Sequence, residues 1–455
     1  MSVLAAAPLV LRRHGGIATA LPIIGFTAST GILATVLGGL GAFLSRAATV
    51  GTGSGADGPP TPEASNLSFL VICAIVATVL LVPSAMGLGS AAAKLSLARR
   101  EKDLAAVRLV GGTSAQVGAL AVADVLVQAM LGSVLGIVLH LAVTPALTLL
   151  DFGMDRFTIG ELVMPLWGYP LLLFATTLLA GISAAIALAG VVISPLGVAR
   201  ESRIVRMSVV RLVVWAGLIL AFIGALQFLP MLVGGVENGM VVMIAVSAVL
   251  MALVIGSVNI VGPFVVWVIA RILAALAPTP ALLVGARRLA ADPRAGWRSV
   301  SGVTFALVVA GFLTLTGMLG EQGDDAAGRA LATALDTGGL LTLGIAAVLA
   351  AVSTGVTQTA RVLDQGRVYR SQHVAGAPVV ALQRARIAEI GIPLALAGMI
   401  AGVSAAGLVA PVISGGFVLE AVLSYLLAAV GALGLVALSV AASAPLVGRV
   451  ARAGA

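Results

Sequence analysis

Residues 99–136 read RREKDLAAVRLVGGTSAQVGALAVADVLVQAMLGSVLG, and they contain two patterns that recur along the whole chain. The first is a short cluster of charged side chains. The second is an apolar run that continues to Leu149 and holds one acid, Asp124. Because about 20 apolar residues are enough for a helix to cross the hydrocarbon core of a bilayer, the stretch predicts a membrane-spanning helix that follows a charged segment at the membrane surface.

The composition of the whole chain supports this interpretation. Of 455 residues, 60% are hydrophobic and 10% are charged, whereas about 25% of the residues of a soluble domain are charged. A water-soluble fold could not bury this much apolar surface, so we expect an all-α polytopic membrane protein whose solvent is lipid. The single cysteine, Cys73, and the lack of metal-ligand spacing predict neither an internal disulfide nor a metal site.

Ten apolar runs are long enough to cross a bilayer. The sixth run exceeds one simple span, and Gly262-Pro263 predicts a kink within it, because proline lacks the backbone donor of a helical hydrogen bond. The ten predicted spans cover residues 17–44, 67–93, 117–149, 165–193, 209–230, 239–276, 300–320, 336–358, 387–413 and 417–444.

The basic residues divide unequally between the two sets of loops that ten spans create. Nearly all of them lie in one set, and the other set holds only Arg46, Arg156 and Arg329 among many acids. The positive-inside rule places the basic loops and both chain ends in the cytoplasm, and such clusters argue against a nucleic-acid partner. Because arginine is used almost to the exclusion of lysine in an Ala-, Gly- and Val-rich chain, we expect a bacterial inner membrane.

The first and last parts of the chain resemble each other at a fixed spacing. The basic segments 99–113 and 364–378 align without a gap, and so does the acid that follows each. The matched pairs are Gly111 with Gly376, Thr113 with Pro378, and Asp124 with Glu389. Two glycines four residues apart then follow in each half, offset by one residue, namely Gly132 with Gly136 and Gly398 with Gly402.

This repeat predicts a 4+2+4 arrangement of spans. Residues 1–206 would form the first four-helix unit, residues 207–280 two linking helices, and residues 281–455 the second four-helix unit. Since each half begins and ends on the cytoplasmic side, the two repeats would be parallel and related by an axis along the membrane normal.

The stretch from Arg99 to Gly136 resembles the signature region of FtsX-like (MacB-type) ABC transporter permeases. That signature is a basic helix containing Arg-Glu, a Leu-Gly-Ala-Thr-like turn, and a span with an early acid and a Gly-rich stretch. The corresponding residues are Glu101, Arg108, Gly111, Thr113, Asp124, Gly132 and Gly136. The ten-span layout is similar to that of bacitracin-export-type permeases, but only residues 320–337 stand where those proteins carry a large outer domain.

The resemblance implies the permease subunit of an ATP-driven complex that exports or extracts an amphiphile, or that transmits force across the membrane. The sequence contains no Gly-x-x-x-x-Gly-Lys-Ser/Thr loop, so we expect no catalytic residue and no enzyme activity of the chain alone. ATP and Mg would be bound by a separate cytoplasmic ABC ATPase dimer. The residues expected to couple to that dimer are Arg100, Glu101, Lys102, Arg108, Gly111, Thr113, Arg367, Arg370, Gly376 and Pro378.

Two acids, Asp124 and Glu389, lie inside predicted spans. A charged side chain in lipid costs about 2.5–3.5 kcal/mol on insertion scales, so each acid needs a partner or water. Arg386 lies three residues before Glu389, at a helical-neighbour spacing, which predicts an ion pair. Such a pair would act as a hinge or lock near the cytoplasmic face, and a snorkelling pair at the interface is the simpler alternative.

Two other classes of function stay open at this point. The chain could be a non-transport scaffold that regulates a cell-envelope enzyme or an extracytoplasmic partner protein, although its short outer loops count against this. It could also be a secondary transporter. That class uses polar residues at mid-membrane and broken helices, which the predicted spans mostly lack.

Overall fold

The computed structural model describes residues 17–53, 62–109, 113–192, 209–233, 239–321, 326–409 and 419–452. Every regular element within these ranges is an α-helix, and nine helices there are long and apolar enough to cross a membrane. They match nine of the ten predicted spans, and the remaining span, 300–320, matches helix α11 (Ser301–Glu321). The prediction of an all-α polytopic membrane protein is therefore confirmed.

The outward surfaces of the long helices are apolar, as lipid requires. Val138 is 57% exposed, Phe174 is 65% exposed and Leu427 is 73% exposed. In water each exposed apolar side chain of this size would forgo about 1.5–3 kcal/mol of burial free energy. Acyl chains remove that penalty, and helices satisfy their own backbone hydrogen bonds in lipid.

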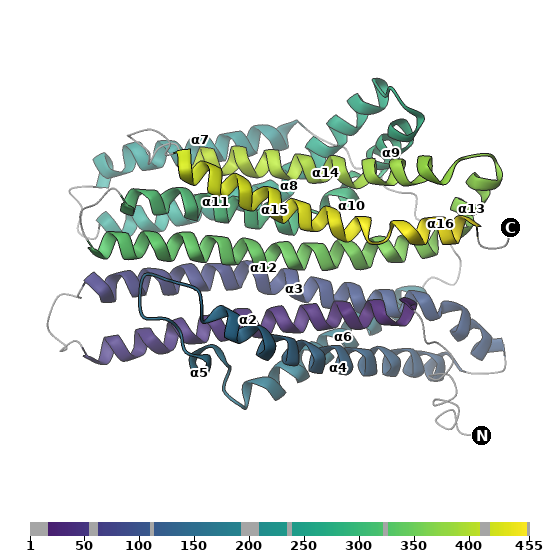
Figure 1. Cartoon of the computed structure of the whole chain (residues 1–455), viewed down its shortest axis with the longest axis horizontal. Helices are drawn as coiled ribbons and strands as arrows, with labels where there is room; N and C mark the ends of the chain where they lie inside the picture. The colour runs from purple at the N-terminus through teal and green to yellow at the C-terminus, as the bar shows by residue number, and fades with distance from the viewer. Residues whose placement is uncertain are drawn as a thin grey trace. The chain divides into compact units, whose positions relative to one another are not determined.

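The chain folds into two compact units, of which unit 1 comprises residues 1–150 with 156–203 and unit 2 comprises 151–155 with 204–455. In unit 1, α2 and α6 each pack against both α3 and α4 (Figure 1). Phe26, Leu97 and Val125 form the apolar core between these helices, together with small alanines. The described helices of unit 1 are α2 (Ile17–Gly53), α3 (Pro62–Leu109), α4 (Ser114–Leu147), α5 (Ile159–Leu162) and α6 (Gly168–Val192).

Two glycines of α4 allow a close approach to α2. A Cβ atom at Gly132 would lie 2.5 Å from the Cβ atom of Phe26, and one at Gly136 would lie 2.6 Å from the carbonyl oxygen of Thr27. These neighbours are backbone or next to it, so they cannot move aside as the end of a flexible side chain could. Gly132 and Gly136 thus make a small-residue contact of the kind that lets membrane helices approach closely.

Buried hydroxyl groups connect the same helices. Thr30 Oγ1 donates a hydrogen bond to Ser133 Oγ at 3.0 Å, and Ser133 Oγ lies 3.0 Å from Thr176 Oγ1. The Thr176 hydroxyl in turn donates to the carbonyl oxygen of Leu172 at 2.9 Å. Side-chain hydrogen bonds between helices in a membrane contribute about 0.6 kcal/mol each, so this chain fixes α2, α4 and α6 in register more than it adds stability.

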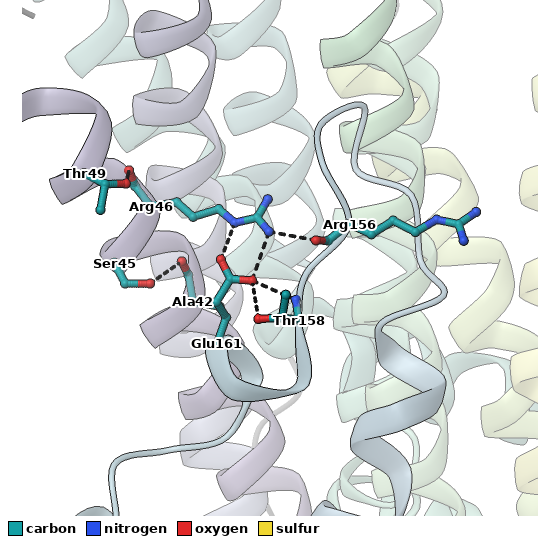
Figure 2. A network of polar contacts seen from close by, with 7 residues as sticks. All are labelled: Ala42, Ser45, Arg46, Thr49, Arg156, Thr158 and Glu161. Atoms are coloured by element: carbon teal, nitrogen blue, oxygen red, sulfur yellow. Dashed lines mark hydrogen bonds and ion pairs between the residues drawn. The ribbon is translucent and has the colours of Figure 1, made fainter. Parts of the chain in front are cut away.

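The loop between α4 and α6 is fastened to the end of α2 by an ion pair (Figure 2). Arg46 Nε donates to Glu161 Oε1 at 2.7 Å, and Arg46 Nη2 donates to Glu161 Oε2 at 3.1 Å. Thr158 donates to Glu161 Oε2 from its backbone N at 2.7 Å and from its hydroxyl at 2.8 Å. The guanidinium of Arg46 also lies 3.9 Å from the centroid of the Phe157 ring. Arg46 is an exception to the charge segregation, and this clamp accounts for it.

The clamp is expected to weaken in acid. The Arg46 hydrogen bond, aided by those of Thr158, lowers the pKa of Glu161 from its ordinary value of 4.5 to about 2. A carboxyl whose folded pKa is lowered stabilises the fold above its unfolded pKa, and that contribution is lost as the pH falls from about 4.5 toward 2. The protection factors of the amides of residues 156–162, which compare the observed exchange rate with the intrinsic rate at each pH, should therefore fall across this interval.

The matched variants for this test are Arg46→Gln, Glu161→Gln and the double variant. At pH 7 this double-mutant cycle should give a coupling free energy of about 1 kcal/mol between Arg46 and Glu161, because their ion pair is bidentate and only partly screened by solvent. A coupling of zero, or the same acid response in Glu161→Gln as in the native chain, would show that this ion pair does not hold the loop.

In unit 2, α11 packs against α12, α14 and α15. Val303, Leu307 and Ala310 of α11 are buried in this core, and the Tyr425 hydroxyl donates to the carbonyl oxygen of Leu307 at 3.0 Å. The described helices of unit 2 are α7 (Val210–Val233), α8 (Gly239–Ala275), α9 (Pro280–Ala291), α10 (Pro293–Arg298), α11, α12 (Ala326–Asp364), α13 (Gly366–Val374), α14 (Val379–Val409), α15 (Leu419–Ala441) and α16 (Ala444–Arg452).

Four short helices, α9, α10, α13 and α16, lie toward one end of unit 2, which we call its basic end (Figure 1). The indole of Trp297 in α10 covers Gly262 of α8, so that a side chain at Gly262 would overlap the ring. Trp297 Nε1 donates to Asn259 Oδ1 at 3.3 Å. Gly262 therefore serves a close contact, and the kink expected at Gly262-Pro263 stays a prediction.

The corresponding glycines of α14, Gly398 and Gly402, pack less closely than Gly132 and Gly136 do. A Cβ atom at Gly398 would meet only the Leu433 side chain, at 3.0 Å, and one at Gly402 would meet nothing within 4 Å. Ala397 and Ala401, one residue earlier, are both 0% exposed. One residue turns the chain by about 100° around a helix, so the more closely packed small face of α14 is made by the alanines.

Candidate functional site

Helix α13 occupies most of the second predicted coupling segment. It begins at Gly366 and ends at Val374. The turn that follows is closed by hydrogen bonds from Gly376 N to the His373 carbonyl at 3.0 Å and from Ala377 N to the Gln372 carbonyl at 2.9 Å. Gly376 has φ +97°, a conformation that favours glycine. The backbone conformation therefore explains why this position of the predicted motif is a glycine.

Helix α13 is held in place by a small core of its own. Tyr369 of α13 packs with Val362 of α12, Leu382 of α14 and Val447 of α16. Val447 is 0% exposed and Tyr369 is 4% exposed. Polar contacts of α14 support the same junction, because Gln383 Nε2 donates to the Ala444 carbonyl at 3.2 Å. The C-terminal helix α16 thus forms a base on which α13 rests.

The opposite side of α13 faces outward. Arg367, Val368 and Arg370 are exposed, and Val374 at the end of the helix is 80% exposed. Pro378 is also exposed and precedes the first residue of α14. The four second-segment residues expected to couple to an ATPase, Arg367, Arg370, Gly376 and Pro378, are thus brought together on one surface helix and the turn after it.

The first predicted coupling segment differs from the second. The backbone at Arg100, Glu101, Lys102 and Arg108 belongs to α3, which runs without interruption from Pro62 to Leu109. The charged stretch is therefore the end of a long helix and not a separate segment, because Ala, Leu, Lys, Arg and Glu are strong helix formers and residues 100–109 contain no Gly or Pro. The four side chains and Gly111 lie outside the described part of the chain.

Thr113 has a definite structural role at the start of α4. Its side chain accepts a hydrogen bond from Gln116 N at 3.3 Å, and Gln116 Oε1 accepts one from Thr113 N at 3.1 Å. This reciprocal capping box contributes about 1 kcal/mol to a helix N-terminus. Thr113 therefore fixes where α4 begins, whatever else it contacts.

The two acids inside spans have different surroundings. Asp124 is 6% exposed and accepts a hydrogen bond from Gln128 Nε2, one turn further along α4, at 2.7 Å. Glu389 lies 3.7 Å from Arg361 Nη1 of α12. Arg386 instead donates to the Ser443 hydroxyl at the junction of α15 and α16.

The predicted ion pair between Arg386 and Glu389 is therefore wrong. Residues three apart on a helix point about 60° away from each other, so in α14 they can meet different neighbours. Arg386 ties α14 to the α15–α16 junction, whereas Glu389 reaches the last turns of α12. Glu389 thus has an ion-pair partner, but the partner is supplied by another helix, and the hinge or lock role stays a prediction.

A cavity of about 330 Å³ adjoins this ion pair at the basic end of unit 2. Its walls come from α9, α10, the end of α12 and the first turns of α14. Its principal lining residues are Arg288, Asp292, Gln358, Arg361, Glu389 and Ile390. Sequence reasoning singled out Glu389 but did not identify this cavity, because the residues that line it are spread over about a hundred positions and its other charged residues resemble ordinary topology signals.

Comparisons of the chain with protein-family models, with curated proteins and with solved structures found no match. The fold by itself defines the class. The chain is a multi-pass α-helical membrane protein, and the described part of unit 2 carries, at one end, an exposed helix on its own small core beside a charged cavity.

Proposed function

We propose that this chain is the permease subunit of an ATP-driven ABC complex of the MacB/FtsX type. It would lie in a bacterial inner membrane with both ends in the cytoplasm, and a cytoplasmic ABC ATPase dimer would supply ATP and Mg. The complex would export or extract an amphiphile, or transmit force to the outer side. The observation that carries the proposal is α13, a surface helix supported from below and placed between two long helices.

The register of the sequence repeat agrees with helix positions. Thr113 directly precedes the first residue of α4, and Pro378 directly precedes the first residue of α14. Asp124 lies ten residues beyond Ser114, and Glu389 lies ten residues beyond Val379. Matched residues thus stand at the same height on corresponding helices, which supports two related four-helix units.

Helix packing supports the same repeat. In unit 1 the packed pairs include α2 with α3, α2 with α4, α3 with α6, and α4 with α6. In unit 2 the pairs α11 with α12, α11 with α14, α12 with α15, and α14 with α15 also pack. These four pairings among the first, second, third and fourth helices therefore recur in both sets, whereas the second and third helices pack closely only in unit 1, as α3 with α4; α7 with α8 would be the linking pair.

Helix α13 has the properties that an ATPase contact requires. It offers two arginines and two exposed valines on a rigid base, and it is joined by short turns to α12 and α14. A push on α13 would therefore reach the Arg361–Glu389 pair and the bundle. In the first unit, the extension of α3 through Arg108 would play the equivalent part.

The test is purification of the tagged full chain in mild detergent from its own membranes, followed by labelling with a photoreactive ATP analogue. A labelled ATPase of ABC type should co-purify. Glu101→Ala is expected to lower the coupled ATP hydrolysis roughly tenfold, and Arg370→Ala by no more than about threefold, since the second segment lacks the Arg-Glu pattern. Arg384→Ala, exposed on α14 outside both segments, is the control.

Equal losses for Glu101→Ala and Arg370→Ala would contradict the unequal roles of the two segments. A chain that purifies without any nucleotide-binding partner, and that is active when driven by a proton gradient alone, would contradict the permease proposal itself.

A further inference from the structure

The cavity at the basic end of unit 2 has the size and lining of a ligand site. Its volume of about 330 Å³ falls at the lower end of the range for small-molecule pockets. Gln358 and Ile390, which line it, are 6% and 4% exposed. One hydrogen bond joins two of the walls, because the Thr354 hydroxyl of α12 donates to the carbonyl of Ser299, the residue after α10, at 2.9 Å.

Two arginines bring positive charge to the cavity from different helices. Arg361 of α12 has Glu389 as a partner, but at 3.7 Å this is looser than the 2.7–2.9 Å typical of charge-assisted hydrogen bonds. Arg288 of α9 has no ion pair within the part of the chain that the structure describes. Two guanidinium groups around one space are suited to the oxygens of a phosphate group.

Two carboxylates balance these charges. Asp292 Oδ1 accepts a hydrogen bond from Ala295 N at 3.1 Å, which positions this side chain at the start of α10. Glu389 is partly exposed, with 26% of its side-chain surface accessible. A lining with two cations and two anions favours a ligand that is itself zwitterionic, with a phosphate for the arginines and an ammonium for the carboxylates.

The cavity also lies where a lipid headgroup would be found. Gln358 and Arg361 are in the last turns of the apolar span Ala326–Leu363, and Glu389 and Ile390 follow the start of the span Val379–Leu408. Helix ends at which apolar residues give way to arginine mark the headgroup level of a bilayer, and basic pockets between helices there bind phospholipid headgroups.

We propose that this cavity binds the phosphoethanolamine headgroup of a phospholipid, with Arg288 and Arg361 on the phosphate and Glu389 on the ammonium. Phosphatidylethanolamine has a primary ammonium that can donate to a carboxylate, whereas the quaternary ammonium of phosphatidylcholine cannot. The proposal does not depend on the ATPase partner, because it concerns a site within unit 2.

The test is native mass spectrometry of the full chain in detergent, titrated separately with phosphatidylethanolamine, phosphatidylcholine and phosphatidylglycerol. One phosphatidylethanolamine should be retained at least tenfold more tightly than the other two lipids. The double variant Arg288→Gln with Arg361→Gln should lose this affinity at least tenfold. Glu389→Gln should bind phosphatidylethanolamine and phosphatidylcholine equally. Arg384→Gln, an exposed arginine at the same end outside the cavity, should bind as the native chain does.

Competition with soluble phosphoethanolamine distinguishes a bound phospholipid from a free metabolite that has the same headgroup. Millimolar phosphoethanolamine should leave the bound lipid in place. If phosphoethanolamine displaces the lipid when the two are present at equal concentration, the site binds a free metabolite and the lipid assignment is overturned. Tighter binding of phosphatidylglycerol, or unchanged lipid binding in the double variant, would overturn the proposal as a whole. If the double variant fails to fold, the lipid preferences of the native chain and of Glu389→Gln decide the question.

Discussion

Replacement of Gly136 by alanine is expected to destabilise unit 1 by about 2 kcal/mol or more. The new Cβ atom would lie 2.6 Å from the Thr27 carbonyl oxygen and 2.8 Å from the Gly31 backbone nitrogen. Because both neighbours are backbone atoms, α2 and α4 would have to separate, and overpacking of this kind typically costs about 1–3 kcal/mol. The separation would also disturb the hydroxyl chain from Thr30 to Thr176.

The matched control is Gly402→Ala, since a Cβ atom at Gly402 would meet nothing within 4 Å. Alanine is favoured over glycine inside a helix by about 0.8–1.0 kcal/mol, so this variant should be slightly more stable than the native chain. Unfolding by denaturing detergent, followed by circular dichroism, would measure both changes. If both substitutions change the free energy of unfolding in the same direction, the close approach of α2 and α4 is not as described.

Replacement of Val447 by aspartate is expected to release α13 from its base. Val447 is 0% exposed in the core with Tyr369 and Leu382, and a carboxylate buried there without a partner should cost about 3 kcal/mol or more. Trypsin should then cleave faster after Arg367 and Arg370. If α13 is the ATPase contact that we propose, ATP hydrolysis by the complex should lose its coupling as well.

Pro445→Asp places the same charge at an exposed position in the first turn of α16, where an acid is favourable for the helix dipole. This control should leave both the cleavage rate and the coupling unchanged. Normal protection of residues 366–374 in Val447→Asp would contradict the small core as the support of α13. Faster cleavage with intact ATPase coupling would confirm the core and contradict the role of α13.

Much of the architecture could be predicted because hydropathy and charge are local properties of a chain. Each apolar run is long enough to require a membrane, whatever its neighbours are, and each predicted span coincides with a long helix. The gap-free match of Thr113 with Pro378 pairs the residues that directly precede α4 and α14, although the predicted spans began at residues 117 and 387. These conclusions need no knowledge of which helix faces which.

The candidate site was less accessible to sequence reasoning. Most of the second predicted coupling segment forms the surface helix α13, but the support of this helix lies in Val447, which the sequence analysis did not single out. The sequence of α16, with apolar Leu446 and Val447 beside Arg449, is amphipathic, which indicates that one face of this helix packs against another element. Its partner α13 could not be named, because nothing local specifies which surface such a face covers.

Sequence alone was sufficient for the lipid-embedded class and the spans, since both follow from the free energy of placing residues in hydrocarbon or water. The folded chain decided the partner of Glu389, the small face at Ala397 and Ala401, and the cavity between α9, α12 and α14. These depend on how each helix is rotated about its axis. Rotation is set by packing among neighbours, and an offset of one residue turns a side chain by about 100° to another partner.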